Sequence, residues 1–253
     1  MVEIKAAEAL EAMREAGRVV ARALAAVREA AAVGVSLLEL DQVARDVLEA
    51  AGATSPFLGY RPSFAPTPFP AVICTSVNDA IVHGIPTGYR LADGDLLSVD
   101  CGAELGGWTG DAAVSFTVGT PGPGDTALLD ATRGALDAAI AAARPGNRIG
   151  DLSHAIETVA AGYGMPADFG GHGIGRRMHE DPPVPNRGRR GRGYPLRPGL
   201  ALAIEPMLIA GGGDSYRTGP DGWTLHTTDG SRAAHFEHTV AITEDGPRVL
   251  TLL

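Results

Sequence analysis

Residues 98–116 read SVDCGAELGGWTGDAAVSF, two runs of small and apolar residues around a glycine-rich centre. This pattern is typical of a β-hairpin. Each run carries one aspartate, Asp100 in the first and Asp111 in the second. If the turn is centred on Leu105 and Gly106, the aspartates lie directly opposite each other, where like charges destabilise the strand pair. Either one carboxylate bonds to solvent or the turn, or a cation lies between the two.

The second half of the chain repeats the first. Three pairs of segments match: 34–52 with 146–164, 93–100 with 197–205, and 111–116 with 237–242. The last two matches pair Asp100 with Glu205 and Asp111 with Glu237. Self-similarity on this scale predicts a single α/β domain over residues 1–253, built from pseudo-symmetric halves at about 1–120 and 121–253.

Hydrophobic periodicity predicts the secondary structure around these segments. We expect helices over 3–32, from Ser36 (with Glu39 completing a capping box) to near Gly52, and over 124–144 and 150–162. Residues 56–70 contain five prolines and are predicted to form a loop. Strands are expected at 71–76, 79–83, 95–103 and 111–118, and near 200–209, 223–227, 235–242 and 247–251.

Composition restricts the class of protein. A chain of 253 residues with 45% hydrophobic content can bury one substantial core. The net charge of −9 argues against a general nucleic-acid-binding surface, so we expect no DNA partner. Two cysteines do not make a disulfide framework. With no signal-peptide pattern and no apolar run of about 18 residues, we expect a cytoplasmic protein with no membrane partner. We also expect a monomer.

The acidic residues in the predicted strands indicate a metal site. Four carboxylates in apolar strands need a compensating charge, which divalent cations supply. His172 lies in the glycine-rich stretch DFGGHGIGRRMHEDPP (168–183), with His179 seven residues later. A single histidine is more often structural than a ligand, but four neighbouring acids favour a ligand here. Four carboxylates and one imidazole suit Mn, Fe or Co at least as well as Zn, and two such ions would activate water to hydrolyse an amide or ester.

Six segments, in order along essentially the whole chain, resemble methionine aminopeptidase of type I. They are VEIKAAEALEAMREAGRVVARAL, ICTSVNDAIVHGIP, DGDLLSVDCGAELGGWTGDAAVSF, GGHGIGRRMHEDP, LRPGLALAIEPM and DGWTLHTTDGSRAAHFEHTVAIT. The resemblance implies the pita-bread fold, an α/β (α+β) architecture with an antiparallel sheet flanked by helices. It also implies two divalent metal ions (Mn, Fe, Co or Zn) and release of the initiator methionine from nascent chains.

The resemblance also implies roles for single residues. The implied metal ligands are Asp100, Asp111, His172, Glu205 and Glu237. Asp111 and Glu237 would bridge the ions, and Glu205 would also carry a proton during catalysis.

The remaining implied roles concern the substrate. His179 would polarise the scissile carbonyl and His83 would assist the departing amine. The implied substrate-binding residues are His83, His179, Cys74, Phe69, Tyr60, Met178 and Trp223. Because the loop after Tyr60 is longer than is usual in the family, the sequence leaves open whether Tyr60 or Phe64 lines the pocket.

Two other functions are compatible with the same set of five metal ligands. An Xaa-Pro aminopeptidase or prolidase-type hydrolase usually carries an additional N-terminal domain, whereas the first predicted core strand here begins near residue 71. A non-catalytic pita-bread binding module typically loses metal ligands, and all five are present. The segments around Cys74 and Trp223 favour methionine as the substrate side chain.

The segment NRGRRGRGYPLRPG (186–199) concentrates positive charge in a glycine-rich stretch. Arg187, Arg189, Arg190 and Arg192 lie within six residues of one another. The segment is either a solvated surface loop or a contact with ribosomal RNA, where nascent chains emerge.

Overall fold

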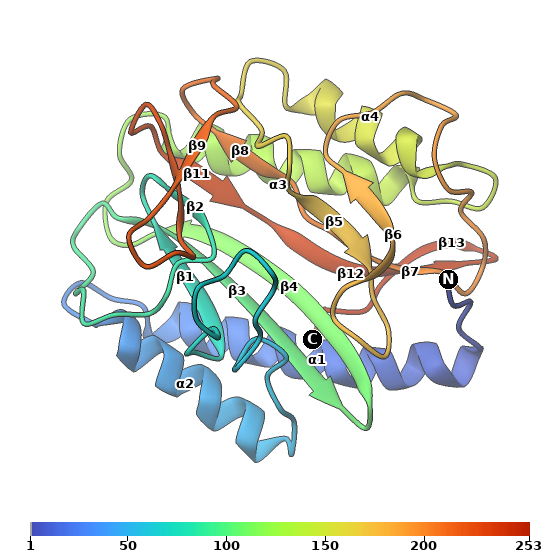
Figure 1. Ribbon diagram of the computed structural model, residues 1–253, viewed down its shortest axis with the longest axis horizontal. Helices are drawn as coiled ribbons and strands as arrows, with labels where there is room; N and C mark the ends of the chain where they lie inside the picture. The colour runs from blue at the N-terminus through green and yellow to red at the C-terminus, as the bar shows by residue number, and fades with distance from the viewer. Residues whose placement is uncertain (1) are drawn as a thin grey trace.

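A computed structural model describes residues 2–253 of the chain. The described residues form four α-helices, α1 (Ala7–Ala30), α2 (Leu37–Ala50), α3 (Asp125–Ala142) and α4 (Ile149–Val159). The predicted capping box is present, since Ser36 Oγ accepts the Glu39 amide and the Glu39 carboxylate accepts the Ser36 amide. Figure 1 shows the α1–α2 pair and the α3–α4 pair on opposite sides of the view, with the strands between them. Among residues 2–253, no helix combines the length and hydropathy needed to cross a membrane.

The strands form one large sheet and two small ones, and all their pairings are antiparallel. The eight-stranded sheet has the order β1 (Ile73–Val77), β3 (Leu96–Leu105), β4 (Trp108–Thr117), β12 (Glu237–Thr243), β7 (Ala201–Ile204), β5 (Gly170–Gly173) and β6 (Glu180–Pro185), with β13 (Gly246–Val249) beside β12. The small sheets are β2 (Ala80–Val82), β10 (Leu225–Thr227) and β9 (Tyr216–Thr218), and β11 (Ala233–His235) with β8 (Met207–Ile209). The β4–β12 pair joins a strand from the first half of the chain to one near the C-terminus.

Side-chain alternation puts the helices and the candidate site on opposite faces of the large sheet. Val99 and Cys101 of β3 are buried in a core with α1 and α2, while Asp100 between them lines a cavity. In the other half, Leu202 and Ile204 of β7 belong to the core formed with α3 and α4. The helices therefore cover the back of the sheet and leave its front for the site.

Matching glycines adopt the same backbone conformation in the two parts of the chain. Gly34 and Gly146, which precede α2 and α4, have φ of 88° and 93°, and their amides donate to the carbonyls of Leu91 and Leu196. Residues with a Cβ rarely adopt such angles, so both connections depend on glycine. The division of the domain near residue 120 stays a prediction.

Three strands were not predicted from the sequence, and one predicted strand is split in two. The sequence did not predict β5, β6 or β9, because β5 is glycine-rich, β6 contains three prolines and β9 has only three residues. The prolines are tolerated in β6 because it lies at the edge of the sheet. The strand expected near 200–209 is split between β7 and β8 around Pro206, which has no amide to donate to a strand pairing.

Candidate metal and substrate site

A cavity of about 230 Å³ lies on the front of the large sheet. It is lined by Phe57, Tyr60, Phe64, Phe69, Cys74, His83, Asp100, Asp111, Phe169, Gly170, His172, Met178, His179, Glu205, Met207, Trp223 and Glu237. All twelve residues that the sequence predicted for the site are in this set. The fold therefore brings together side chains that are spread over most of the chain.

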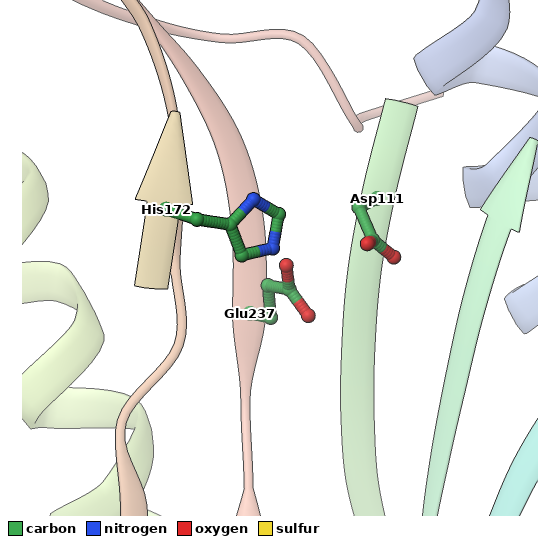
Figure 2. Close-up of side chains that lie close together, drawn as sticks. All are labelled: Asp111, His172 and Glu237. Atoms are coloured by element: carbon green, nitrogen blue, oxygen red, sulfur yellow. The ribbon is translucent and has the colours of Figure 1, made fainter. Parts of the chain in front are cut away.

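Three strands deliver potential metal ligands to one point of the cavity. Asp111 comes from β4, His172 from β5 and Glu237 from β12. Figure 2 shows the three side chains converging from their strands. One ligand atom from each lies within 4.8 Å of one atom from each of the others. Three ligands at such separations can contact one divalent cation.

The register of the β3–β4 hairpin corrects one expectation. The turn is formed by Gly106 and Gly107, so Asp100 lies opposite Ala113 and Asp111 lies opposite Gly102. The two aspartates are thus diagonal neighbours rather than direct partners. Asp111 is two positions from Ala113, the direct partner of Asp100, so the two side chains still share the front face of the hairpin.

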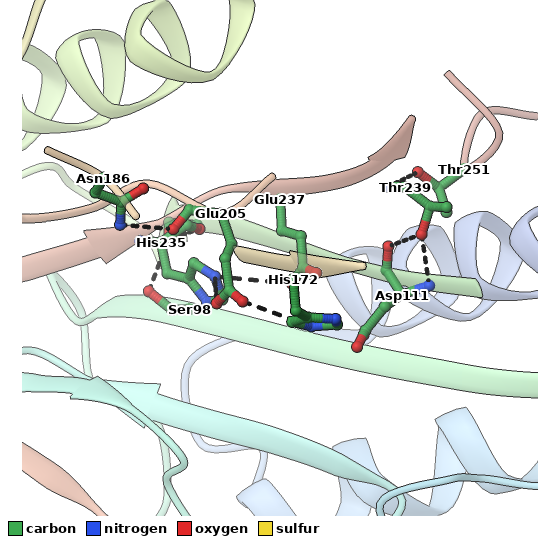
Figure 3. A network of polar contacts seen from close by, with 10 residues as sticks. Ser98, Asp111, His172, Asn186, Glu205, His235, Glu237, Thr239 and Thr251 are labelled. Atoms are coloured by element: carbon green, nitrogen blue, oxygen red, sulfur yellow. Dashed lines mark hydrogen bonds and ion pairs between the residues drawn. The ribbon is translucent and has the colours of Figure 1, made fainter. Parts of the chain in front are cut away.

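Glu205 lies between β7 and β8, beside two histidines. Its Oε1 is 3.6 Å from His172 Nε2, and its Oε2 is 3.5 Å from His235 Nε2. His235 Nε2 is also 3.8 Å from Glu237 Oε2. Figure 3 shows this chain of contacts, which links the predicted ligands through a histidine that the sequence analysis did not single out.

The backbone around the ligands is held by hydroxyl groups. The Asp111 amide donates to Thr239 Oγ1, which in turn donates to the Asp111 carbonyl at 2.8 Å. The His235 amide donates to Ser115 Oγ at 2.9 Å, and that hydroxyl donates to the His235 carbonyl at 2.7 Å. These bonds cross between β4 and the β11–β12 region, so they fix the strands that carry the acids.

Burial changes the pKa of every predicted carboxylate ligand. It raises the pKa of Asp100 to about 7 and that of Glu205 to about 8. Burial and the neighbouring acids raise the pKa of both Asp111 and Glu237 well above the ordinary value. A cluster of buried acids of this kind is costly to ionise without a nearby cation.

Unpartnered oxygens show that the acids fit a metal. Buried Oδ1 atoms of Asp100 and Asp111, and Oε1 of Glu237, have no hydrogen-bond partner among the described residues. Buried polar atoms normally have one. Burial also lowers the pKa of His172 to about 3, so its imidazole is neutral at pH 7, as a metal ligand must be. The donor set is therefore suited to divalent cations.

His83 and His179 lie at the same cavity but outside the ligand cluster. The rings of His179 and His172 are 4.4 Å apart, edge to face. His83 has a φ of 60°, and its buried Nδ1 has no partner among the described residues. Burial lowers the pKa of His179 and, aided by neighbouring histidines, lowers that of His83 to about 4. Both imidazoles are therefore neutral at pH 7 and each can donate one hydrogen bond to a substrate.

Aromatic rings and sulfur form the apolar wall. The Phe69 and Trp223 rings are 5.1 Å apart in an edge-to-face arrangement, and Cys74 and Met178 belong to the same buried cluster. Both Tyr60 and Phe64 line the cavity, which resolves the alternative left open by the loop length. Their rings lie 6.5 and 5.9 Å from the Trp223 ring.

Sequence reasoning missed several residues at this site. Phe57, Phe169 and Met207 line the cavity but were not predicted. Phe169 lies within the glycine-rich stretch 168–183 that the sequence analysis singled out, which is a signal that could have found it. His235 lies two residues before Glu237 in the strand expected at 235–242, and strand alternation puts both side chains on one face, which is a signal that could have found it.

The arginine-rich segment lies between β6 and β7, away from the cavity lining. Arg187 pairs with Asp214 through both Nη atoms and lies 4.0 Å from Glu157. The side chains of Arg189, Arg190 and Arg192 are exposed and have no ion pair within residues 2–253. The segment therefore presents three uncompensated positive charges to solvent.

The sequence matches known metallopeptidases along nearly its whole length. The profile of metallopeptidase family M24 matches residues 11–244. Methionine aminopeptidase 1 of Mycobacterium tuberculosis is 52% identical over 261 aligned residues, which cover 100% of this chain and 96% of the relative. Methionine aminopeptidase 1 of Bacillus subtilis is 42% identical over 99% of both chains. These matches confirm the resemblance indicated by the six motifs.

Solved structures share the fold. A methionine aminopeptidase from Thermotoga maritima superposes with a TM-score of 0.95 at 39% identity, covering 100% of both chains. The prolidase from Pyrococcus furiosus has a TM-score of 0.74 at 22% identity and covers 99% of this chain but 65% of its own. These likenesses confirm the predicted α/β (α+β) architecture with its antiparallel sheet.

Proposed function

Because the chain belongs to metallopeptidase family M24, we propose that it removes the initiator methionine from the N-terminus of nascent proteins. One observation carries the proposal: a cluster of buried carboxylates shares its cavity with a wall of aromatic rings and sulfur, and three of the acids each have an oxygen without a hydrogen-bond partner within residues 2–253. The acids can hold divalent cations beside a scissile amide. The wall, with Cys74, Phe69 and Trp223, suits the thioether of a methionine side chain.

Two divalent metal ions are proposed as the cofactor. The residues that would hold them are Asp100, Asp111, His172, Glu205 and Glu237. When bound, such ions polarise a carbonyl and lower the pKa of water, which supplies the nucleophile for amide hydrolysis. The excess of oxygen ligands suits Mn, Fe or Co at least as well as Zn. Elemental analysis of protein purified under nitrogen should give two ions per chain; a single ion after saturation with each metal contradicts this stoichiometry.

Individual side chains have separate roles in the hydrolysis. Glu205 accepts the proton that the attacking water loses and passes it to the departing amine. His179, neutral at pH 7, donates a hydrogen bond to the scissile carbonyl oxygen as negative charge develops there. His83, whose Nδ1 is unpartnered, binds on the amine side of the same bond. The apolar wall, including Tyr60 and Met178, excludes water from the methionine side chain.

The direct test is an assay on two peptides. Met-Ala-Ser should lose its methionine in the presence of Mn²⁺, Co²⁺ or Fe²⁺, and chelation should abolish the release. An Xaa-Pro peptide, the substrate of the rival hydrolases in this fold class, should stay intact under the same conditions. Cleavage of the Xaa-Pro peptide alone would overturn the proposal. Metal binding without cleavage of either peptide would favour a non-catalytic binding module.

A ribosome contact is proposed for the Arg187–Arg192 segment. Its support is the exposed, uncompensated charge of Arg189, Arg190 and Arg192 on a chain of net charge −9. Phosphate contacts of this kind weaken as salt increases. Changing these three arginines to glutamate should weaken cosedimentation with ribosomes at low salt, whereas changing Arg14, Arg18 and Arg22 of α1 to glutamate should not. Equal binding by the two triple variants would rule the contact out.

We further propose that the enzyme acts as a monomer in the cytoplasm, where nascent chains first expose their N-terminus. Light scattering should give the mass of one 253-residue chain across a range of concentrations. A mass that doubles on concentration would contradict the monomer. Fractionation of the source cells should place the activity in the cytoplasmic fraction.

A further inference from the structure

The single lysine of the chain is buried beside Glu180, the residue that follows His179. Lys5 is one of 21 lysine and arginine residues, and all the others are arginine. Its side chain is 1% exposed, and Nζ lies 3.0 Å from Glu180 Oε2, on a side chain that is 10% exposed. Burying a charged pair is expensive unless its geometry is good. A buried lysine in a chain that otherwise uses arginine therefore points to a specific role.

Two glycines make the space that Lys5 occupies. A Cβ at Gly175 would lie 2.5 Å from Lys5 Cε and 2.7 Å from Nζ. A Cβ at Gly199 would lie 2.6 Å from the Lys5 carbonyl oxygen, and the Lys5 amide donates to the Gly199 carbonyl at 2.7 Å. The resulting slot fits a slim ammonium group, whereas a planar guanidinium is wider. This accounts for lysine rather than arginine at this position.

Glu180 connects Lys5 to the turn that carries His179. While Oε2 binds Lys5, Oε1 accepts the Arg177 amide at 3.1 Å. The Gly175 amide donates to the Arg177 carbonyl at 3.1 Å, which closes the same turn. Met178 and His179, both of which line the cavity, lie between these anchored residues. The placement of the His179 ring thus depends on a carboxylate that Lys5 holds.

We propose that Lys5 is a positioning residue that acts through Glu180 to hold His179 at the scissile carbonyl. This inference rests on the proposed function, in which His179 donates a hydrogen bond to that oxygen. It gives the segment before α1 a role in catalysis although Lys5 is not among the residues that line the cavity. Because Lys5 touches none of the predicted metal ligands by hydrogen bond or ion pair, its loss should leave metal binding intact.

The kinetic test is Lys5→Met, which keeps the aliphatic stem and removes the ammonium. We expect kcat for Met-Ala-Ser to fall roughly ten- to a hundredfold, the cost of a misplaced catalytic group, with KM changed less than threefold. In a His179→Ala background, Lys5→Met should cause no further fall in the residual kcat. The matched control is Arg248→Ala, which breaks the exposed Arg248–Glu11 ion pair at α1 and should leave kcat unchanged. An equal fall in both backgrounds, or no fall in the wild-type background, would overturn the proposal.

A second variant tests the inference in case Lys5→Met alone does not fold. In Lys5→Met alone, the buried Glu180 carboxylate loses its ammonium partner. Combining it with Glu180→Gln removes that carboxylate, so the double variant should fold even if Lys5→Met does not. If Lys5 acts by positioning, the double variant still loses kcat at unchanged metal affinity. Full kcat in the folded double variant would contradict the inference.

A spectroscopic test is independent of turnover. Selective ¹³C-lysine labelling gives one lysine spin system, because Lys5 is the only lysine. Adding L-methionine to the metal-loaded enzyme should shift both the Lys5 signal and the Trp223 indole signal. In the Glu180→Gln variant, methionine should still shift the Trp223 signal but no longer the Lys5 signal. A Trp223 shift without a Lys5 shift would overturn this inference alone. If neither signal shifts, the methionine pocket of the proposed function fails, and this inference fails with it.

Discussion

Asp100 and Asp111 lie diagonally across the β3–β4 hairpin, two positions out of direct opposition in the strand register. Diagonal neighbours on one face have a larger separation than direct partners, so their charges repel less. They remain close enough for their pKa values to depend on each other. The hairpin thus places two acids at a distance that a cation can bridge, without the cost of direct opposition.

Replacing Asp100 by asparagine should impair metal binding while leaving the fold intact. The amide has nearly the same volume but no charge, and Asp100 Oδ1 has no hydrogen-bond partner within residues 2–253 to lose. We expect one metal ion per chain to be lost and kcat to fall by about 10²-fold or more. Calorimetric titration with Mn²⁺ and the Met-Ala-Ser assay measure the two effects. Asp130→Asn, on the exposed face of α3, is the matched control, and activity equal to that control would refute the ligand role.

The metal-free protein should lose stability as pH rises. Asp100, with a pKa of about 7, and Glu205, with a pKa of about 8, stay protonated when folded but ionise near pH 4 when unfolded. The folded state then binds more protons, so the free energy of unfolding falls between about pH 4 and pH 8. Melting temperatures of chelated protein from pH 5.5 to 8.5 should decrease accordingly.

Two controls isolate the acids as the cause of this pH dependence. A combined Asp100→Asn and Glu205→Gln variant should show a flatter decrease, because the two titrating groups are gone. Saturating Mn²⁺ should reverse the trend, since metal binding releases their protons. A chelated wild-type protein whose melting temperature rises over this range would contradict the raised pKa values.

The sequence predicted the chemistry of the site better than its geometry. The acids were predicted because each one interrupts an apolar strand, and His172 because glycines surround it. The turn of the hairpin was predicted one residue too early, although Gly-Gly is a favoured two-residue hairpin turn and indicates Gly106-Gly107. The pairing of Leu105 with Trp108 fixes the turn.

Residues that depend on the meeting of distant segments were the ones missed. His235 lies beside Glu205 because β11 pairs with β8, where His235 is opposite Met207, two residues after that acid. Phe57 reaches the cavity because its loop packs against Trp223, whose indole donates to the Thr67 carbonyl at 3.0 Å. Local periodicity contains no information on such contacts.

The turn of the hairpin can be tested at Gly106. Its φ of 60° and the 77° of Gly107 suit a two-residue turn in which asparagine is favoured at the first position. A Cβ at Gly106 meets nothing within 4 Å, so only the backbone angle opposes substitution. Gly106→Asn should leave the free energy of unfolding within about 1 kcal/mol of wild type. Gly106→Val should lower it by about 1–2 kcal/mol more than the asparagine variant. Equal stability of the two variants in urea would contradict the assigned turn.

His235 should prove important for metal affinity although the sequence analysis passed over it. Its side chain is 2% exposed, and its unpartnered Nε2 lies 3.5 Å from Glu205 and 3.8 Å from Glu237. Because Ser115 holds both the amide and the carbonyl of His235, substitution should leave the backbone in place. His235→Leu removes the polar neighbour of both acids and should weaken Mn²⁺ binding by about 10–100-fold, whereas His235→Gln keeps an N–H donor and should weaken it less. Calorimetric titration of both variants, with His154→Leu on α4 as the control, measures the difference. Mn²⁺ affinity of the leucine variant equal to that of the control would show that His235 only fills space.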